Sequence, residues 1–422
     1  MKALLGTIGT RYLIAILNLA LIFINAKVLG IEGVGLVGLI IAAVGIVSIV
    51  CGILAGNTIV YFMNRYSLQT IFLPSYCWVP MGASLTCGCM ALLGLLPEGY
   101  MSEVLILSIL NSLVAANSRF LLGKNHIWGF NLTFILQGGL LFFVLMFLYY
   151  GLNKKDVTAY IWGLYVTNGI AFLCSLLLLY PYIKQKEKET QPNKGSLYSL
   201  LKEMFAYGLW SSADNIAETL TTRLNYFLIK RFIGLGGVGL LDAGTKISES
   251  VWHINRSIGF IEYSRVAQTD NPNEQKEITL RYFKLACVAV TLATGCILLI
   301  PEWFYTDYLF SKEFVGMKQV IAGLSIGIVA FAGNSILSQY FIGSGKVRYS
   351  TGCSFVGLFT LCIAGFVLIP LYEIVGSAIS TSIAFCAMLT FSLTAFCKKT
   401  GTHLHEFLIH KEDILFVLNK FK

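Results

Sequence analysis

Long runs of apolar residues without a single charge dominate the chain. Seven of these runs exceed the roughly 18 residues that mark a membrane-spanning helix: 33–64, 66–97, 127–153, 157–183, 319–345, 349–372 and 374–397. Helices that carry an occasional charge must be added, and the predicted spans are then 6–28, 36–62, 71–96, 103–122, 128–150, 158–182, 205–229, 238–263, 283–301, 318–341, 350–370 and 374–397. The pattern predicts an all-α integral membrane protein with about 12 transmembrane helices.

Ionisable residues interrupt the apolar pattern most clearly in the span 238–263. Asp242, Lys246, Glu249, His253 and Arg256 follow one another at steps of 4, 3, 4 and 3, which places them on one stripe of a helix. A charge near the bilayer centre costs about 2.5–3.5 kcal/mol. The row must therefore face a water-filled cavity, a bound ligand or opposite charges on neighbouring helices. A transporter is the simplest protein that keeps such a row.

The composition agrees with a membrane protein. Of the 422 residues, 56% are hydrophobic and only 13% are charged, whereas soluble proteins carry about 25% charged residues. No removable signal peptide is expected, and the first span acts as the insertion signal. The 11 cysteines include no CxxC pair and lie almost all in apolar spans, so we expect small buried residues, no metal and no cofactor.

The distribution of Lys and Arg predicts the orientation in the membrane. Twenty of them lie on the side of the N-terminus and seven on the opposite side, with four inside spans. The side that is richer in cations faces the cytoplasm, so we expect both termini there. The net charge of +9 is accounted for by these loops, and no nucleic acid is expected as a partner.

The hydrophilic segments predict the domain organisation. Residues 1–183 form an N-terminal six-helix lobe, and 184–202, with five lysines, form a cytoplasmic linker. Residues 203–397 form a C-terminal six-helix lobe. The tail 398–422 repeats leucines at near-helical spacing among lysines, which is typical of an amphipathic helix on the inner membrane surface.

The two halves share a short sequence signature. Residues 28–38 read VLGIEGVGLVG and residues 232–242 read FIGLGGVGLLD, so that Gly30 matches Gly234 at an offset of 204. Both segments fall between the first and second span of a half. A weaker match links 123–124 with 343–346. Because six helices per half is an even number, the two halves are expected to be related by a parallel repeat.

The segment TRYLIAILNLALIFINAKVLGIEGVG (10–35) resembles the start of Wzx-type polysaccharide flippases, and its sharpest motif is LGxxGxG after the first span. These flippases belong to the multidrug/oligosaccharidyl-lipid/polysaccharide exporter superfamily, together with multidrug and toxin extrusion carriers and lipid II flippases. The resemblance implies a V-shaped bundle of two lobes around a central cavity, and alternating access. It also implies a bacterial cytoplasmic (inner) membrane location, with an undecaprenyl-pyrophosphate-linked oligosaccharide as substrate. Membrane lipids and other polysaccharide assembly proteins, for lipopolysaccharide or capsule, are the further partners that it implies.

A pyrophosphate that crosses the bilayer needs cations, and Arg meets phosphate oxygens bidentately. The expected substrate-binding residues are the four embedded cations and two polar neighbours at seven-residue steps from the first of them: Arg11, Asn18, Asn25, Arg223, Lys246 and Arg256. The alternative is that the cations neutralise carboxylates within the fold.

Embedded carboxylates are candidates for ion coupling. Asp214 and Glu218 are four residues apart on one helix face, and two carboxylates that close cannot both ionise cheaply. They could therefore couple transport to H+ or Na+, with Asp242, Glu249 and His253 as further candidates. The alternative is a structural salt bridge to the span 238–263.

These features favour a flippase for a lipid-linked oligosaccharide, with ion coupling, over an enzyme. The alternative within the superfamily is a cation-coupled multidrug efflux carrier, an antiporter. A membrane-bound glycosyltransferase or polymerase would need an outer domain, and no predicted outer loop is long enough for one. No P-loop, zinc motif or nucleophile arrangement is present in the sequence.

Overall fold

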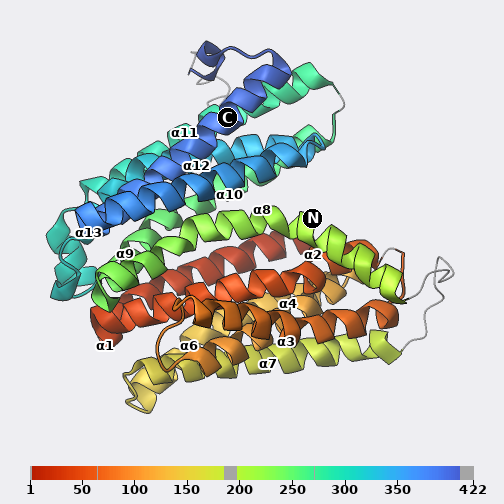
Figure 1. Cartoon of the computed structure of the whole chain (residues 1–422), viewed down its shortest axis with the longest axis horizontal. Helices are drawn as coiled ribbons and strands as arrows, with labels where there is room; N and C mark the ends of the chain where they lie inside the picture. Colours follow the sequence, from red (N-terminus) through yellow and green to blue (C-terminus); the bar gives the residue numbers. More distant parts are fainter. Residues whose placement is uncertain (1, 64, 185–196, 270, 409–422) are drawn as a thin grey trace. The chain divides into compact units, whose positions relative to one another are not determined.

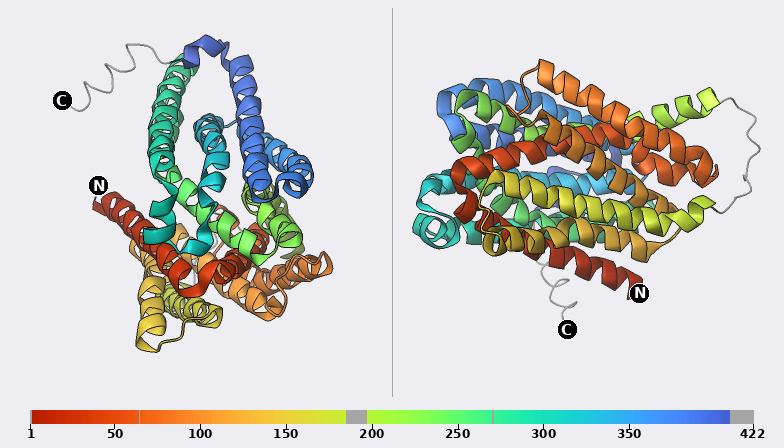
Figure 2. Two further views of the ribbon diagram at one scale, coloured as in Figure 1. Left: turned by 90° about the vertical axis from the view of Figure 1, so that its left-hand side faces the viewer. Right: turned by 90° about the horizontal axis from the view of Figure 1, so that it is seen from below.

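The computed structural model describes residues 2–63, 65–184, 197–269 and 271–408, and in these ranges every regular element is a helix (Figures 1 and 2). The chain divides into two compact units, residues 1–219 and 220–422. The elements of the first unit are α1 (Lys2–Ala55), α2 (Asn57–Phe62), α3 (Leu68–Leu92), α4 (Met101–Gly123), α5 (Ile127–Phe134), η1 (Ile135–Gly139), α6 (Leu140–Met146), η2 (Phe147–Gly151) and α7 (Val157–Lys184). Helix α8 (Leu197–Phe232) begins in the first unit and ends in the second.

The second unit continues with helices alone among its described residues. Its elements are α9 (Leu235–Ser250), α10 (Trp252–Ala267), α11 (Pro272–Leu299), η3 (Phe304–Leu309), η4 (Lys312–Phe314), α12 (Met317–Gly343), α13 (Val347–Thr400) and η5 (Leu404–Phe407). Three short elements, η1, η2 and η3, are π-helices, in which the backbone is wound more widely than in an α-helix.

The number of membrane spans agrees with the prediction. Seven helical segments of the described chain are long and apolar enough to cross a membrane. Two of them, Ile16–Phe62 and Val347–Thr400, have 47 and 54 residues, and since one span needs about 20, each holds two. The less apolar helix α3, helix α8 and the α9–α10 pair supply the remaining spans. The predicted all-α membrane fold with about twelve spans is thus confirmed.

The internal repeat is visible in the backbone. Gly30 breaks α1 with φ 69° and ψ −179°, and Gly234 precedes α9 with φ 104° and ψ −172°. This backbone region is open almost only to glycine. Both residues lie between the first and second span of a half, where the sequence signature placed them. The backbone therefore confirms that Gly30 and Gly234 are equivalent.

The weaker match after the fourth span of each half is also a structural repeat. The turn after α4 contains Asn125 with φ 56°, and the turn after α12 contains Gly345 with φ 74°. In both places an amide beyond the turn reaches back five residues, from His126 N to Leu121 O at 2.9 Å and from Lys346 N to Phe341 O at 2.7 Å. This is the Schellman arrangement of a helix end.

A buried polar pair repeats as well. The Asn117 side chain donates to Ser175 Oγ at 2.9 Å, and Ser392 Oγ donates to the Asn334 side chain at 2.7 Å. In each pair the two residues are 58 positions apart. Each pair joins the fourth span of a half to its sixth, with the amide as donor in the first unit and as acceptor in the second.

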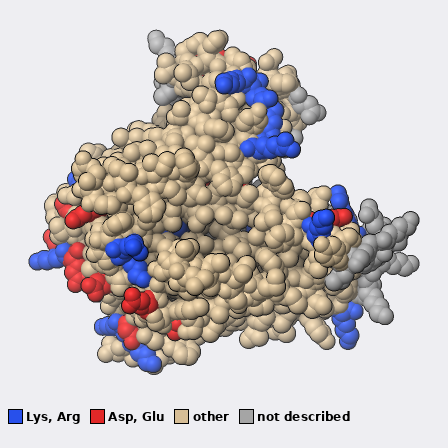
Figure 3. Space-filling view, viewed as in Figure 1, with Lys and Arg blue, Asp and Glu red and all other residues tan. Residues whose placement is uncertain are grey.

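Each unit is built around the fourth helix of its half. In the first unit α4 packs against α1, α3 and α7, and in the second α12 packs against α9, α10, α11 and α13. Gly323 and Gly327 let α12 approach α13, where Ser382 Oγ donates to Gly323 O at 2.6 Å. Figure 3 shows that most of the visible surface is uncharged, as expected where lipid covers a protein.

Only the first part of the predicted tail and the edges of the predicted linker are described. Residues 185–196 and 409–422 lie outside the described residues. After α13 the chain returns to α11, where Glu406 pairs with Lys276 at 2.8 Å. Phe407 packs against Phe283 and Phe396. The hydrogen bonds from Lys276 and from the His403 amide hold the pKa of Glu406 below its ordinary value.

Candidate functional site

The row of five ionisable residues is divided between two helices. Helix α9 ends at Ser250 and α10 begins at Trp252, with tighter i to i+3 bonds around Val251. Asp242 is buried at 2% exposure, whereas His253 and Arg256 are exposed. The row therefore does not form the single stripe that the spacing predicts.

The first three of these residues join α8 in a network of charges. Lys246 Nζ lies 2.7 Å from Asp242 Oδ2, and Tyr226 Oη donates to Asp242 Oδ1 at 3.1 Å. Arg223 donates to Tyr226 Oη and to Glu249 Oε2, each at 3.1 Å. Two cations and two carboxylates thus form two neutral pairs, and the Tyr226 hydroxyl contacts both pairs. This arrangement corresponds to the alternative in which Arg223 and Lys246 are neutralised within the fold.

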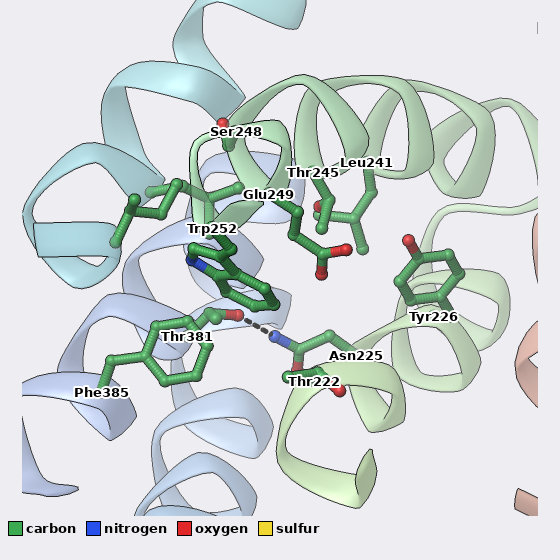
Figure 4. A pocket seen from close by; sticks show the side chains of 12 residues that line it. Thr222, Asn225, Tyr226, Leu241, Thr245, Ser248, Glu249, Trp252, Thr381 and Phe385 are labelled. Atoms are coloured by element: carbon green, nitrogen blue, oxygen red, sulfur yellow. Dashed lines mark hydrogen bonds between the residues drawn. The ribbon is translucent and has the colours of Figure 1, made fainter. Parts of the chain in front are cut away.

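A small pocket adjoins this network (Figure 4). Its volume of about 20 Å³ has room for about one water molecule. The Asn225 side-chain amide lies 2.8 Å from Thr381 Oγ1 and 3.1 Å from Ser377 O, while its carbonyl oxygen has no hydrogen-bond partner among the described residues. Figure 4 shows the Glu249 carboxylate pointing into the same space. The pocket can solvate these polar groups but is too small for an organic substrate.

The first unit contains a larger and more polar cavity. Its volume is about 340 Å³, within the range of ligand sites. The lining comes from α1, α4, α8 and the start of α2, and consists of Ser48, Ile49, Gly52, Ala55, Gly56, Asn57, Ser112, Ala115, Arg119, Ser211, Ser212, Asn215 and Thr219. Hydroxyls, amides and one guanidinium dominate it. None of these described lining residues is acidic or aromatic.

Close helix packing shapes this cavity. A Cβ atom at Gly208 would overlap the backbone carbonyl oxygen of Ile53, so only glycine lets α8 lie this close to α1. That approach brings Ser211 and Ser212 of α8 to the lining. On the opposite helix, Ser112 is 3% exposed and its hydroxyl adjoins the Cys51 thiol of α1.

A chain of uncharged polar side chains leads away from the cavity through the first unit. Ser48 Oγ accepts from the Asn111 amide at 3.0 Å, and the Gln137 amide donates to Asn111 at 3.1 Å and to Asn168 at 3.0 Å. Gln137 lies in the π-helix η1, and π-helical turns are frequent at functional sites. These residues are uncharged, so the pattern of charges along the sequence does not indicate them. The signal that could have found them is the presence of Asn and Gln inside otherwise apolar spans.

The other predicted site residues are dispersed. Arg11 lies in α1, but its side chain is outside the described side chains. Asn18 is exposed, whereas Asn25 is buried and accepts a hydrogen bond from Tyr149 Oη at 3.1 Å. Asn25 therefore ties α1 to η2 and does not share an exposed polar face with Asn18.

The two predicted coupling carboxylates lie on α8. Asp214 and Glu218 are half-buried, and both make contacts within the structure. They are on the helix that lines the cavity of the first unit, but neither belongs to the lining itself. Among the described residues, no group of three His, Cys, Asp or Glu side chains could hold a metal ion.

Comparison with solved structures identifies the fold. The chain is similar to an inward-facing multidrug resistance MATE transporter of the MOP superfamily, with TM-score 0.70 and 14% identity over 92% of this chain and 94% of the other. It is equally similar to the lipid II flippase MurJ, with TM-score 0.71 and 14% identity over 99% and 93%. The chain has the MOP transporter fold. A MATE transporter of Vibrio cholerae gives TM-score 0.58 and 12% identity over 96% and 98%.

Sequence comparison adds less to the MOP assignment. No family model matches the chain. An uncharacterized membrane protein of Methanocaldococcus jannaschii is 22% identical over 250 residues, which is 58% of this chain and 48% of the relative. The chain thus matches about half the length of that relative. These comparisons show the fold that the chain shares with the MATE transporters and MurJ, and a multi-pass membrane protein.

Proposed function

We propose that the protein is a flippase that moves an undecaprenyl-pyrophosphate-linked oligosaccharide across the bacterial cytoplasmic membrane by alternating access. The proposal is supported by the MOP fold, which MATE transporters and a lipid II flippase share. It is also supported by the resemblance of the segment 10–35 to polysaccharide flippases. Neither of these selects the cargo, so the choice of cargo depends on the chemistry of the cavity in the first unit.

The lining of that cavity is the observation that carries the proposal. Five hydroxyls, two side-chain amides and the Arg119 guanidinium line it. Hydroxyls and amides pair with the hydroxyls of a sugar, and a guanidinium pairs with phosphate oxygens. An amphipathic cargo with a sugar-phosphate head would place its polar part here. Its prenyl chain would stay in the lipid, because exposure of apolar surface to water is unfavourable.

The same lining argues against the rival function, efflux of organic cations. A cation in a cavity is stabilised by carboxylates or by aromatic faces, and the described lining holds neither. Arg119 would in addition repel a cationic drug. The rival therefore needs a different binding site in this chain.

Substitution of Arg119 tests the proposal in cells whose own flippase gene is deleted. The wild-type gene should restore surface polysaccharide and prevent lipid-linked repeat units from accumulating. Arg119→Ala should restore about a tenth or less, because one charge-assisted contact contributes about 1.5–3 kcal/mol. Arg119→Lys should restore part of the function, since it keeps the charge without the fork of donors.

Arg281→Ala is the matched control, because Arg281 is an exposed cation on α11 that pairs weakly with Glu277. It should behave as wild type. Full activity of Arg119→Ala, with the protein present in the membrane at normal level, would contradict the assigned role of this cavity. Failure of the wild-type gene itself to restore polysaccharide would instead contradict the proposed cargo.

Two further elements of the proposal come from the sequence. Arg11 and Arg256 remain candidates for the passage of the pyrophosphate, and Asp214 and Glu218 remain candidates for coupling to H+ or Na+. Both termini are proposed to lie in the cytoplasm, as the distribution of cations predicts. The cavity of the first unit would then lie in the inner half of the membrane, where the cargo is loaded.

A further inference from the structure

A carboxyl group that no candidate site uses is enclosed in the second unit. Glu262 of α10 has no exposed area. Its Oε1 lies 3.0 Å from Thr279 Oγ1 of α11, and its Oε2 has no hydrogen-bond partner among the described residues. Thr279 is also fully buried. The pair sits beside the apolar cluster that contains Val266, Leu280 and Phe283.

Several charged groups on the helices around Glu262 contact other residues. On α11, Lys276 pairs with Glu406, and Arg281 pairs with Glu277. Arg265 of α10 lies over the Tyr282 ring, and Lys346 contacts Tyr340 of α12. On α9, Asp242 and Glu249 are paired with Lys246 and Arg223. No ion pair of Glu262 occurs in the described part of the chain.

The hydroxyl of Thr279 has two acceptors within hydrogen-bond distance. Thr279 Oγ1 lies 2.9 Å from the backbone oxygen of Gln275, to which it can donate, as well as 3.0 Å from Glu262. A hydroxyl has one hydrogen and can donate it once, while its lone pairs accept. If Thr279 donates to Glu262, the enclosed carboxyl accepts this bond and has no cation beside it, and an ionised group in that position is strongly disfavoured. If Thr279 donates to Gln275 instead, Glu262 is the donor in the bond between the two side chains. A carboxyl donates only in its protonated form.

We propose that Glu262 is a proton-binding site, occupied while α10 and α11 are packed together and emptied when they separate. The protonated acid ties the two helices through Thr279. When the contact opens and water enters, the O–H bond of Glu262 breaks, its electron pair stays on the carboxylate and the proton passes to water. The carboxylate then opposes reclosure, because an ionised group without a partner is strongly disfavoured in an apolar interior.

Proton binding at Glu262 stands independently of the cargo, whereas its use as a coupling step rests on the proposed transport function. Loss or gain of one proton would then accompany each movement of α10 against α11. This site differs from Asp214 and Glu218, the coupling candidates of the sequence, and lies in the other unit. It gives the proposed transporter a carboxyl group whose protonation depends directly on helix packing.

Infrared spectroscopy of the protein in lipid nanodiscs tests the protonation state. The difference spectrum between wild type and Glu262→Gln at neutral pH should contain the carbonyl band of a protonated carboxylic acid. Gln keeps the size of the side chain and a donor for Thr279, so the variant should fold. Glu277→Gln, at an exposed carboxylate on α11, is the matched control and should lack that band in its difference spectrum. A Glu262 difference spectrum with only carboxylate bands would overturn the proposal.

Hydrogen exchange on the same samples tests the link to helix packing. Amide exchange is measured at each pH for peptides from 258–267 and 275–286, in wild type and in Glu262→Gln. The ratio of the two exchange rates removes the chemical effect of pH, which is the same in both proteins. The ratio should rise at least threefold toward alkaline pH, because only the wild type gains a charge there. A ratio that stays constant would refute the link to packing. Neither measurement uses the cargo, so failure of the proposed function would not affect them.

Discussion

Removal of Arg223 separates a structural role for the embedded charges from a role in substrate binding. Arg223 is the hub of the network, because it contacts both Tyr226 Oη and Glu249 at 3.1 Å. Arg223→Ala would leave the Glu249 carboxylate without its cation in a largely enclosed place, where its side chain is 18% exposed. We expect the second unit to lose stability when this contact is removed.

The magnitude follows from the burial of the pair. Removing one partner of a fully buried ion pair costs about 3–5 kcal/mol. Arg223 and Glu249 are 29% and 18% exposed, so water screens the pair in part and the lower end applies, about 3 kcal/mol. For a unit of this size, each kcal/mol lowers the unfolding temperature by about 2–4 °C, so the expected loss is roughly 6–12 °C.

The assay is thermal unfolding of the purified protein in detergent, together with a double-mutant cycle. Arg223→Met and Glu249→Met should each destabilise the protein, and the double variant should lose clearly less than the sum, because it leaves no unpaired charge. The control is Arg281→Ala, since Arg281 and Glu277 are 52% and 68% exposed with an N–O distance of 3.5 Å. That exposed pair contributes less than about 1 kcal/mol.

One outcome would refute the reasoning. Arg223→Ala could have an unfolding temperature within a degree or two of that of Arg281→Ala and still abolish surface polysaccharide. The guanidinium would then bind the cargo and would not stabilise the fold through Glu249. The interpretation from the sequence, in which Arg223 binds substrate, would then hold.

Three further predictions concern backbone, topology and pH. Gly234→Ala should destabilise the protein by about 1–3 kcal/mol in the same unfolding assay, because φ is 104° at this residue. Gly236→Ala, at a position with open space around it, is the control. An equal loss of stability in both variants would contradict the argument. In a background without reactive cysteines, Thr190→Cys should label only from the cytoplasm and Tyr100→Cys only from outside, and the reverse at either site would contradict the predicted orientation. The lowered pKa of Glu406 means that its contact with Lys276 stabilises the docked tail above the ordinary value of 4.5 and is lost as the pH falls through the folded-state pKa. Proteolysis at the tail should therefore accelerate at acid pH in wild type but not in Glu406→Gln, and identical pH profiles would refute the role of this pair.

The elements that repeat along the sequence were the most predictable. Spans were visible because each needs about 20 apolar residues, and the Gly30–Gly234 match was visible because only glycine adopts that backbone. The similar placement of Asn117 and Asn334 was hidden, although each amide pairs with a serine 58 positions further along the chain. The offset rises from 204 to 217 between these matches, and most of the rise comes from the connection 300–316, with η3 and η4, which is longer than the connection 93–100.

The site was less predictable because its chemistry depends on packing between helices. Spacing placed Asp242 and Lys246 on one face correctly, and they pair at 2.7 Å. It could not show that the helix is interrupted at Val251 or that Asn25 is used by Tyr149. Arg119 was counted among the loop cations, because the cavity that it lines is assembled from four helices distant in sequence. Glu262 could not be predicted as a site from the sequence, because its role depends on its contact with Thr279 on another helix.

The most direct test of the account is translocation by the purified protein in sealed lipid vesicles. An undecaprenyl-pyrophosphate-linked oligosaccharide is incorporated, and its appearance in the outer leaflet is measured with a lectin that cannot cross the membrane. Efflux of ethidium is measured in parallel as the organic-cation probe. The account predicts that the lipid-linked oligosaccharide crosses, that Arg119→Ala slows it about tenfold, and that ethidium is not moved. Ethidium efflux without translocation of the oligosaccharide would contradict it.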